Sequence, residues 1–136
     1  MTSIDVQTVL ERCMGCVEFA ESLLVDFEVS SRQRAAEIAR LAVHRRWADL
    51  ADAAHALKGA AAIVGAERLR ALAAAAEQAG RSGELCRTSQ VVEELYQEVQ
   101  SCANDIKQLV DQWRQSRDAA QQQPVSGDAV KSDTCS

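Results

Sequence analysis

Apolar residues recur at intervals of three and four along most of the chain, which is the spacing that places side chains on one face of an α-helix. The clearest series runs from Val92 to Trp113, where the two intervals alternate as they do along the contact line of a helical bundle. A second clear series extends from Trp47 to Val64. Together with shorter series, the pattern predicts helices over residues 5–14, 16–27, 32–44, 47–64, 69–79 and 92–113.

Capping residues and glycines indicate where these helices begin and end. Asp5 precedes the first apolar series and has the short polar side chain that accepts a hydrogen bond at a helix N-terminus. Ser30 and Ser31 could cap a new helix in the same way, so the pattern leaves open whether residues 16–44 form one helix or two. Helix ends are predicted at Gly15, at Gly65 and in the turn 80–83.

The composition favours helices over strands. Alanine makes up the largest share of the apolar residues, aromatic residues amount to 4%, and the chain has a single proline. A length of 136 residues suits one domain. We therefore expect an all-α fold over residues 1–117 that begins with a short N-terminal helix. Residues 118–136 have few apolar side chains and are expected to form a flexible tail.

Charge and targeting signals exclude several classes of function. The net charge is -5, and no run of lysine and arginine is long enough to follow a nucleic-acid backbone. The N-terminus lacks the basic and apolar stretches of a secretory signal, and no apolar stretch approaches the ~18 residues of a membrane span. We expect a cytoplasmic protein that binds neither nucleic acid nor membrane.

His55 lies in the middle of the series 47–64 but not on its apolar face. With about 100° between successive residues, the apolar face centres between Leu50 and Ala61, and His55 points roughly 120° away from that centre. Its neighbours one and two turns away are mostly small. We therefore expect an exposed imidazole on a helix surface that a partner can approach closely.

Two neighbours of His55 add to this expectation. Gly59 lies one turn further on, in a helix interior where glycine costs about 0.5–1 kcal/mol relative to alanine. Either it clears the approach to the imidazole or it permits close contact between helices, and the sequence leaves both explanations open. Lys58, also about one turn away, either neutralises a negative group on the ring or is an ordinary solvated lysine.

The segment HALKG at residues 55–59, followed by small residues and Gly65, resembles the motif of the histidine-phosphotransfer (HPt) domain family. In that motif a histidine is followed two positions later by leucine and then by Lys-Gly. The resemblance extends over about residues 15–112, upstream to Trp47 in the turn before the site helix and downstream through the stretch 66–81. It implies an antiparallel four-helix bundle, to which the helix over residues 5–14 is a short N-terminal extra, with the histidine projecting toward solvent from the middle of one helix. Because the chain begins with Met and carries no receiver or kinase segment, we expect a free-standing member of the family.

The resemblance also implies an activity. His55 would accept a phosphoryl group from the aspartyl phosphate of a receiver domain or hybrid kinase and donate it to the aspartate of a response regulator. Imidazole suits this chemistry because it is a neutral nucleophile near physiological pH. By resemblance Nε2 attacks, Lys58 offsets the charge of the phosphoryl group, and Gly59 admits the receiver. The family does not take phosphate from ATP, and the sequence has no glycine-rich nucleotide loop.

Further partners of the site follow from the same resemblance. Glu77 stands where family members carry a polar residue near the histidine, so it could accept a hydrogen bond from Nδ1, but the sequence favours a solvated surface glutamate. Arg81 either assists docking or complements a helix C-terminus. We expect no cofactor in this chain, because no carboxylate cluster adjoins His55. The divalent metal that phosphoryl transfer uses, such as Mg²⁺, would come from the receiver. An exposed docking histidine fits a monomer.

Three alternatives remain beside this interpretation. His44 is expected to end a helix, where imidazole complements exposed carbonyls, rather than to be a second phosphorylation site. The C-x-x-C pattern at Cys13 and Cys16 could be a redox pair or half of a zinc site, but the sequence supplies no further ligands at a suitable spacing, and most cysteines are expected to pack as small apolar residues. The rival function is a docking module that binds receiver domains without transferring phosphate.

Overall fold

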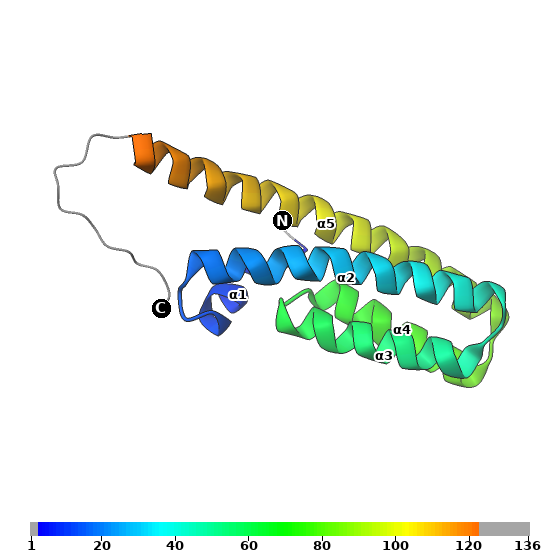
Figure 1. Cartoon of the computed structure of the whole chain (residues 1–136). Coiled ribbons are helices and arrows are strands. Elements are labelled where there is room, and N and C mark those ends of the chain that lie inside the picture. Colours follow the sequence, from blue (N-terminus) through cyan, green and yellow to red (C-terminus); the bar gives the residue numbers. More distant parts are fainter. Residues whose placement is uncertain (1–2, 123–136) are drawn as a thin grey trace.

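Five α-helices follow one another in the computed structural model, which describes residues 3–122. They are α1 (Val6–Arg12), α2 (Val17–Val43), α3 (Trp47–Ile63), α4 (Glu67–Ser82) and α5 (Leu85–Gln122). Helices α2 to α5 run antiparallel, each returning along the one before it, and α1 lies beside the N-terminal part of α2 (Figure 1). The part of the chain that the structure describes contains no strand. The predicted all-α four-helix bundle with a short extra N-terminal helix is confirmed.

The four bundle helices have unequal lengths, and this shapes the molecule. The long helices α2 and α5 extend past the ends of α3 and α4, and α1 lies under this extension (Figure 1). Ion pairs tie the extension together: Glu21 on α2 binds Arg114 at 2.8 Å and Arg117 at 2.9 Å, both on α5. The short helices α3 and α4 form the opposite layer of the bundle, and this layer carries the residues around His55.

Each helix buries one apolar face, and alanine allows the faces to approach closely. Helix α3 buries Leu50, Ala54, Leu57 and Ala61 completely, and α4 buries Leu69 and the alanines on the same face. The closest approach is at Gly80, where an added Cβ would lie 3.0 Å from Leu50 Cδ2 and 3.1 Å from the Trp47 carbonyl oxygen. Glycine at this position therefore lets α4 pack directly on the backbone of α3.

The open question about residues 16–44 is settled in favour of one helix. Helix α2 is continuous from Val17 to Val43, and neither serine caps a new start. Instead, Ser31 Oγ donates to the carbonyl oxygen of Glu28 at 3.2 Å, one turn back in the same helix. Serine can satisfy its hydroxyl inside a helix in this way, so its presence does not force a break.

The predicted N-terminal cap is confirmed. Asp5 accepts a hydrogen bond from the Thr8 backbone amide at 3.2 Å, and this interaction lowers the pKa of its carboxyl group. The Asp5 backbone amide donates to the carbonyl oxygen of Val64 at 3.2 Å, which attaches the start of the chain to the end of α3. Helix α1 itself is shorter than predicted and ends at Arg12. Met14 and Gly15 then adopt positive φ angles in the turn to α2.

The predicted end of α4 and both predicted limits of α5 are wrong. Residues 80–82 belong to α4, and only Gly83, with φ 71° in the left-handed region, ends that helix. The last helix was expected over residues 92–113, but α5 begins at Leu85 and continues to Gln122. Helix therefore extends five residues into the segment 118–136 that was predicted to be a tail. The rest of that segment lies outside the described residues.

Candidate functional site

His55 projects from the middle of α3 into solvent. Its side chain is 65% exposed, whereas Ala54 and Leu57 beside it are completely buried. The helical wheel predicts this contrast, because His55 lies on the flank of the helix away from the core. The imidazole is therefore held by a rigid helix and is still accessible to a second protein.

Gly59, one turn from His55, faces open space. A Cβ added at Gly59 would have no neighbouring atom within 4 Å, in contrast to the crowded position of Gly80. The alternative that Gly59 permits close contact between helices is therefore wrong, and Gly80 is the glycine with that role. The absence of a side chain at Gly59 leaves the surface next to the imidazole flat.

Glu77 reaches the imidazole from the neighbouring helix α4. Its Oε2 lies 3.2 Å from His55 Nδ1, and its side chain is only 13% exposed. The alternative of a solvated surface glutamate is therefore wrong. Lys58 Nζ donates to the other carboxylate oxygen, Oε1, at 3.0 Å. The structure thus brings His55, Lys58 and Glu77 into one hydrogen-bonded group.

Arg81 is the fourth member of this group. Its contact with Glu77 was not predicted from the sequence. Its Nη2 donates to Glu77 Oε2 at 3.0 Å, one turn along α4. The signal that could have found it is the spacing of Glu77 and Arg81, since opposite charges four residues apart on a helix are neighbours. Hydrogen bonds from Lys58 and then from Arg81 lower the pKa of Glu77 from 4.5 to about 2, despite partial burial.

The charge of Glu77 fixes the tautomer of the imidazole. An ionised carboxylate can only accept hydrogen bonds, so the contact with Glu77 requires His55 Nδ1 to carry the ring proton. In the neutral ring, the other nitrogen, Nε2, then has a free lone pair. Such an arrangement suits nucleophilic attack by Nε2, because one hydrogen bond sets the orientation of an exposed imidazole.

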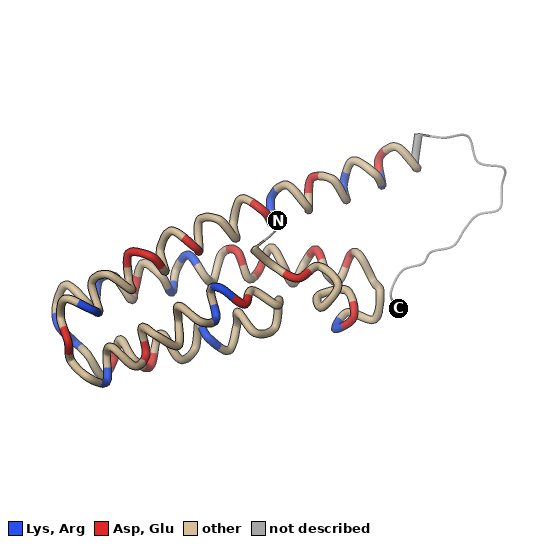
Figure 2. Tube along the Cα trace, turned by 180° about the vertical axis from the view of Figure 1, so that it is seen from behind, with Lys and Arg blue, Asp and Glu red and all other residues tan. Residues whose placement is uncertain are grey.

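A shallow hollow of about 440 Å³ adjoins the carboxylate. Lys58, Glu77 and Arg81 line it together with Arg87 from the start of α5, and two alanines of α4 contribute small side chains. Its walls therefore carry three cations and one anion. Elsewhere, acidic and basic positions are interspersed along the helices (Figure 2). Among the described residues no cluster of three or more histidine, cysteine or acidic side chains could hold a metal ion.

The comparisons with known proteins agree with this fold. The Hpt domain family matches residues 22–123, which is most of the chain and includes α3 and α4. This chain belongs to the Hpt domain family. The solved structure of histidine-containing phosphotransfer protein B from Pseudomonas aeruginosa PAO1 has the same fold, with a TM-score of 0.74 and 22% sequence identity over 80% of this chain and 95% of the other. No curated protein matches the chain.

Membership of the family places this Hpt domain in two-component signalling, where such domains carry phosphoryl groups in phosphorelays and interact with receiver domains. Hpt domains are carriers and not kinases. Within residues 3–122, no helix is long and apolar enough to cross a membrane.

The remaining candidates lie apart from this group. His44 is the residue that ends α2, as expected, and its backbone amide donates to the carbonyl oxygen of Arg40 at 3.2 Å. Cys13 is a buried free thiol, and Cys16 accepts a hydrogen bond from the Phe19 backbone amide at the start of α2. Cys102 is also buried, and burial raises the pKa of its thiol to about 12. Cys13 and Cys102 thus pack as apolar residues, as predicted.

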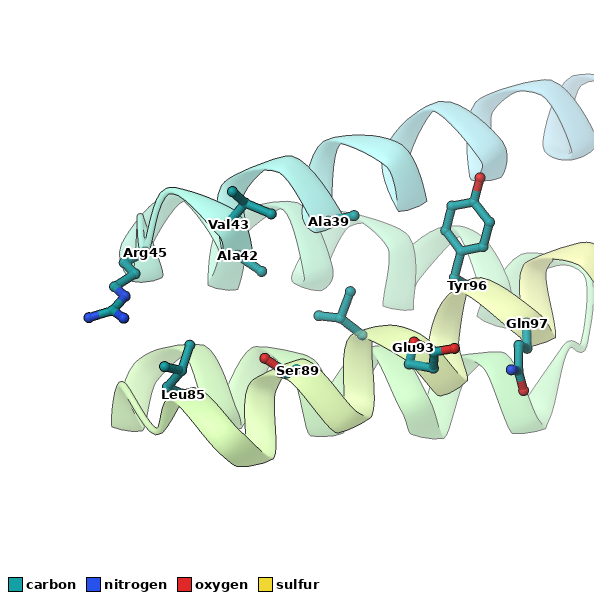
Figure 3. A pocket seen from close by; sticks show the side chains of 10 residues that line it. Ala39, Ala42, Val43, Arg45, Leu85, Ser89, Glu93, Tyr96 and Gln97 are labelled. Atoms are coloured by element: carbon teal, nitrogen blue, oxygen red, sulfur yellow. The ribbon is translucent and has the colours of Figure 1, made fainter.

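A second hollow lies on another face of this Hpt domain. It measures about 490 Å³ and is lined by the end of α2, by Arg45 in the following turn and by the first part of α5 (Figure 3). Val43, Leu85 and Tyr96 give it an apolar character. None of the predicted site residues lines it, so this hollow is separate from the group around His55.

Proposed function

We propose that this Hpt domain is a phosphorelay intermediate whose phosphorylated residue is His55. It would accept the phosphoryl group from the aspartyl phosphate of a receiver domain or hybrid kinase and pass it to the aspartate of a response regulator. The observation that carries the proposal is the bond from Nδ1 to Glu77, which in the neutral ring places the free lone pair on Nε2 of an exposed side chain. Imidazole is the nucleophile here because it attacks while neutral.

The transfer can be written with this group of residues. The Nε2 lone pair attacks phosphorus, the phosphorus–oxygen bond to the donor aspartate breaks, and its electron pair leaves with the donor carboxylate. Nδ1 keeps its proton throughout, held by Glu77, so the phosphorylated ring carries a positive charge. Lys58 lies within reach to offset the negative charge of the phosphoryl group. Transfer to the acceptor aspartate is the reverse of these steps.

The remaining requirements would be met by the partner. Phosphoryl transfer uses a divalent metal to hold the phosphoryl oxygens, and we propose that the receiver supplies it, for example as Mg²⁺. We also propose that the protein has no ATP-dependent kinase activity and acts as a monomer in the cytoplasm. Gly59 supports docking, because an incoming surface meets no side chain at that position.

The proposal is tested by incubating the purified protein with a receiver domain that carries a labelled aspartyl phosphate. We expect the label to appear on the wild-type protein and on His44→Gln, and to be absent from His55→Gln. The proposal fails if no cognate receiver labels the chain, or if His55→Gln accepts label as fast as the wild type. Binding of receivers without any label would favour the alternative, a docking module without phosphotransfer.

A further inference from the structure

One carboxylate serves three partners beside the reactive ring. Glu77 Oε1 accepts from Lys58 at 3.0 Å, while Oε2 is shared by Arg81 at 3.0 Å and His55 Nδ1 at 3.2 Å. Lys58 is thus already engaged before any phosphoryl group arrives. A phosphoryl group on the solvent side of the ring would draw the ammonium group of Lys58 away from Glu77, and the carboxylate then needs another cation.

We propose that Arg81 is a positioning residue that releases Lys58: it remains the counter-ion of Glu77, so that Lys58 can move from the carboxylate to the phosphoryl group on His55. This inference rests on the proposed function of His55. It assigns Arg81 no contact with the phosphoryl group itself, and its effect passes through Glu77 and Lys58.

The division of oxygens between the two cations supports this exchange. Lys58 is on α3, the helix of His55, and it binds the oxygen that does not contact the ring. Arg81 is on α4, the helix of Glu77, and it binds the oxygen that also receives Nδ1. Lys58 can therefore leave without disturbing the bond that orients the imidazole. Its flexible stem and its 32% exposed side chain favour such a movement.

The charges created by phosphorylation drive the same exchange. Attack by Nε2 on a phosphoryl donor leaves a positive ring next to Glu77 and a doubly negative group on the solvent side of the ring. The new anion attracts Lys58, and the new cation strengthens the hold of Glu77 on Nδ1. Without Arg81, Glu77 would compete with the phosphoryl group for Lys58, because a carboxylate with 13% exposure is poorly solvated.

The test measures the lifetime of phosphorylated His55. Phosphoramidate serves as donor: Nε2 attacks phosphorus, the phosphorus–nitrogen bond breaks, and ammonia leaves, so no receiver has to dock. We expect both Arg81→Ala and Lys58→Ala to lose their label about tenfold faster than the wild type, because in each the charge-assisted hydrogen bond from Lys58 to the phosphoryl group is lost: Lys58 stays on Glu77 in the first variant and is absent in the second. Arg81→Lys keeps the counter-ion and should decay at nearly the wild-type rate.

The control is Arg87→Ala. Arg87 lines the same hollow but forms no ion pair with Glu77, and the substitution removes the same charge. We expect its decay rate to stay within about twofold of the wild type. An equal acceleration in Arg81→Ala and Arg87→Ala would overturn the inference, because it would indicate a general effect of positive charge.

Combined variants separate an action through Glu77 from direct contact with the phosphoryl group. Adding Arg81→Ala to Lys58→Ala should cause no further acceleration, since Lys58 is the group that Arg81 releases. The double variant Arg81→Ala/Glu77→Gln should have the same lifetime of phosphorylated His55 as Glu77→Gln alone, because the neutral amide of glutamine does not retain Lys58. The inference would be overturned if Arg81→Ala shortened this lifetime further in the Lys58→Ala background, or if it shortened it in the Glu77→Gln background.

The failure of this inference is distinguishable from that of the proposed function. Absence of label on His55 from both phosphoramidate and every receiver would contradict the carrier role. A normally labelled protein whose Arg81→Ala form decays at the wild-type rate would contradict the counter-ion exchange alone. Circular dichroism of each variant establishes that the helices are intact.

Discussion

Gly59 and Gly80 occupy opposite environments in adjacent helices, and this predicts opposite effects of the same substitution. Gly59→Ala should raise the free energy of unfolding by about 0.5–1 kcal/mol, because the methyl group enters open space and the unfolded chain loses freedom. Gly80→Ala should lower it, because the Trp47 carbonyl oxygen at 3.1 Å cannot yield without separating α3 from α4. Chemical denaturation measures the free energy of unfolding of both variants. An equal increase in the two would contradict the open surroundings assigned to Gly59 and the crowded surroundings assigned to Gly80.

A larger side chain at Gly59 tests docking instead of stability. We expect Gly59→Gln to slow phosphotransfer from a receiver by about ten- to a hundredfold. The added side chain would hold the receiver slightly away from His55, and small displacements of reacting groups slow a reaction by about this much. Labelling by phosphoramidate, which needs no docking, should change far less. Circular dichroism should show unaltered helix content, since nothing lies within 4 Å of the added Cβ. Equal slowing with both donors would contradict a role in docking.

Glu77 stabilises the fold only while it is ionised. Its pKa is lowered from 4.5 to about 2, so its contribution is complete above the pKa of the unfolded chain and is lost as the pH falls from 4.5 toward 2. We expect the wild type to unfold with a larger free energy than Glu77→Gln near neutral pH, and this difference should shrink over that acidic range. Urea denaturation as a function of pH measures it. A difference that stays constant down to pH 2 would contradict the ion pairs.

The helices themselves were predictable to different degrees. The range 47–64 was nearly correct for α3, because a regular apolar face and a glycine after the helix agree on its limits. Helix α5 was much longer than its apolar series, since residues 85–91 and 114–120, which are mostly polar, continue the helix without contributing to the pattern. Ser30 and Ser31 left α2 undecided, because serine is compatible both with a cap and with a helix interior.

The extension of α2 and α5 beyond the bundle depends on a few ion pairs. Burial raises the pKa of Glu21, but hydrogen bonds from Arg117 and Arg114 more than offset it and lower the pKa below its usual value. We expect Glu21→Gln to increase hydrogen exchange of the last turns of α5 while leaving the amides around His55 protected. Glu37→Gln, which breaks an ion pair with Arg40 within one helix, is the control. Faster exchange throughout the bundle would contradict a local role.

At the scale of the whole molecule, the bundle could be predicted because burial of one face per helix determines it. The exposed position of His55 followed from the same periodicity. The contacts between helices could not be predicted from periodicity. Lys58 and Glu77 are 19 residues apart, and their distance depends on the rotation of α4 against α3, which Gly80 sets by close packing. For Glu77 the family resemblance supplied the position, while its pairing with Arg81 came only from the structure.

The distribution of exposed apolar residues predicts a monomer. Met14 and Phe19 lie near the turn between α1 and α2, whereas Val43 and Leu85 lie at the other end of α2 and the start of α5. A stable interface buries about 1,000 Å² or more in one surface, and these groups lie too far apart to form one. Light scattering after size exclusion should therefore give a mass near 14.8 kDa. A dimer mass for the wild type but a monomer mass for Tyr96→Glu would contradict the prediction. It would place an interface at the second hollow, between the end of α2 and the first part of α5.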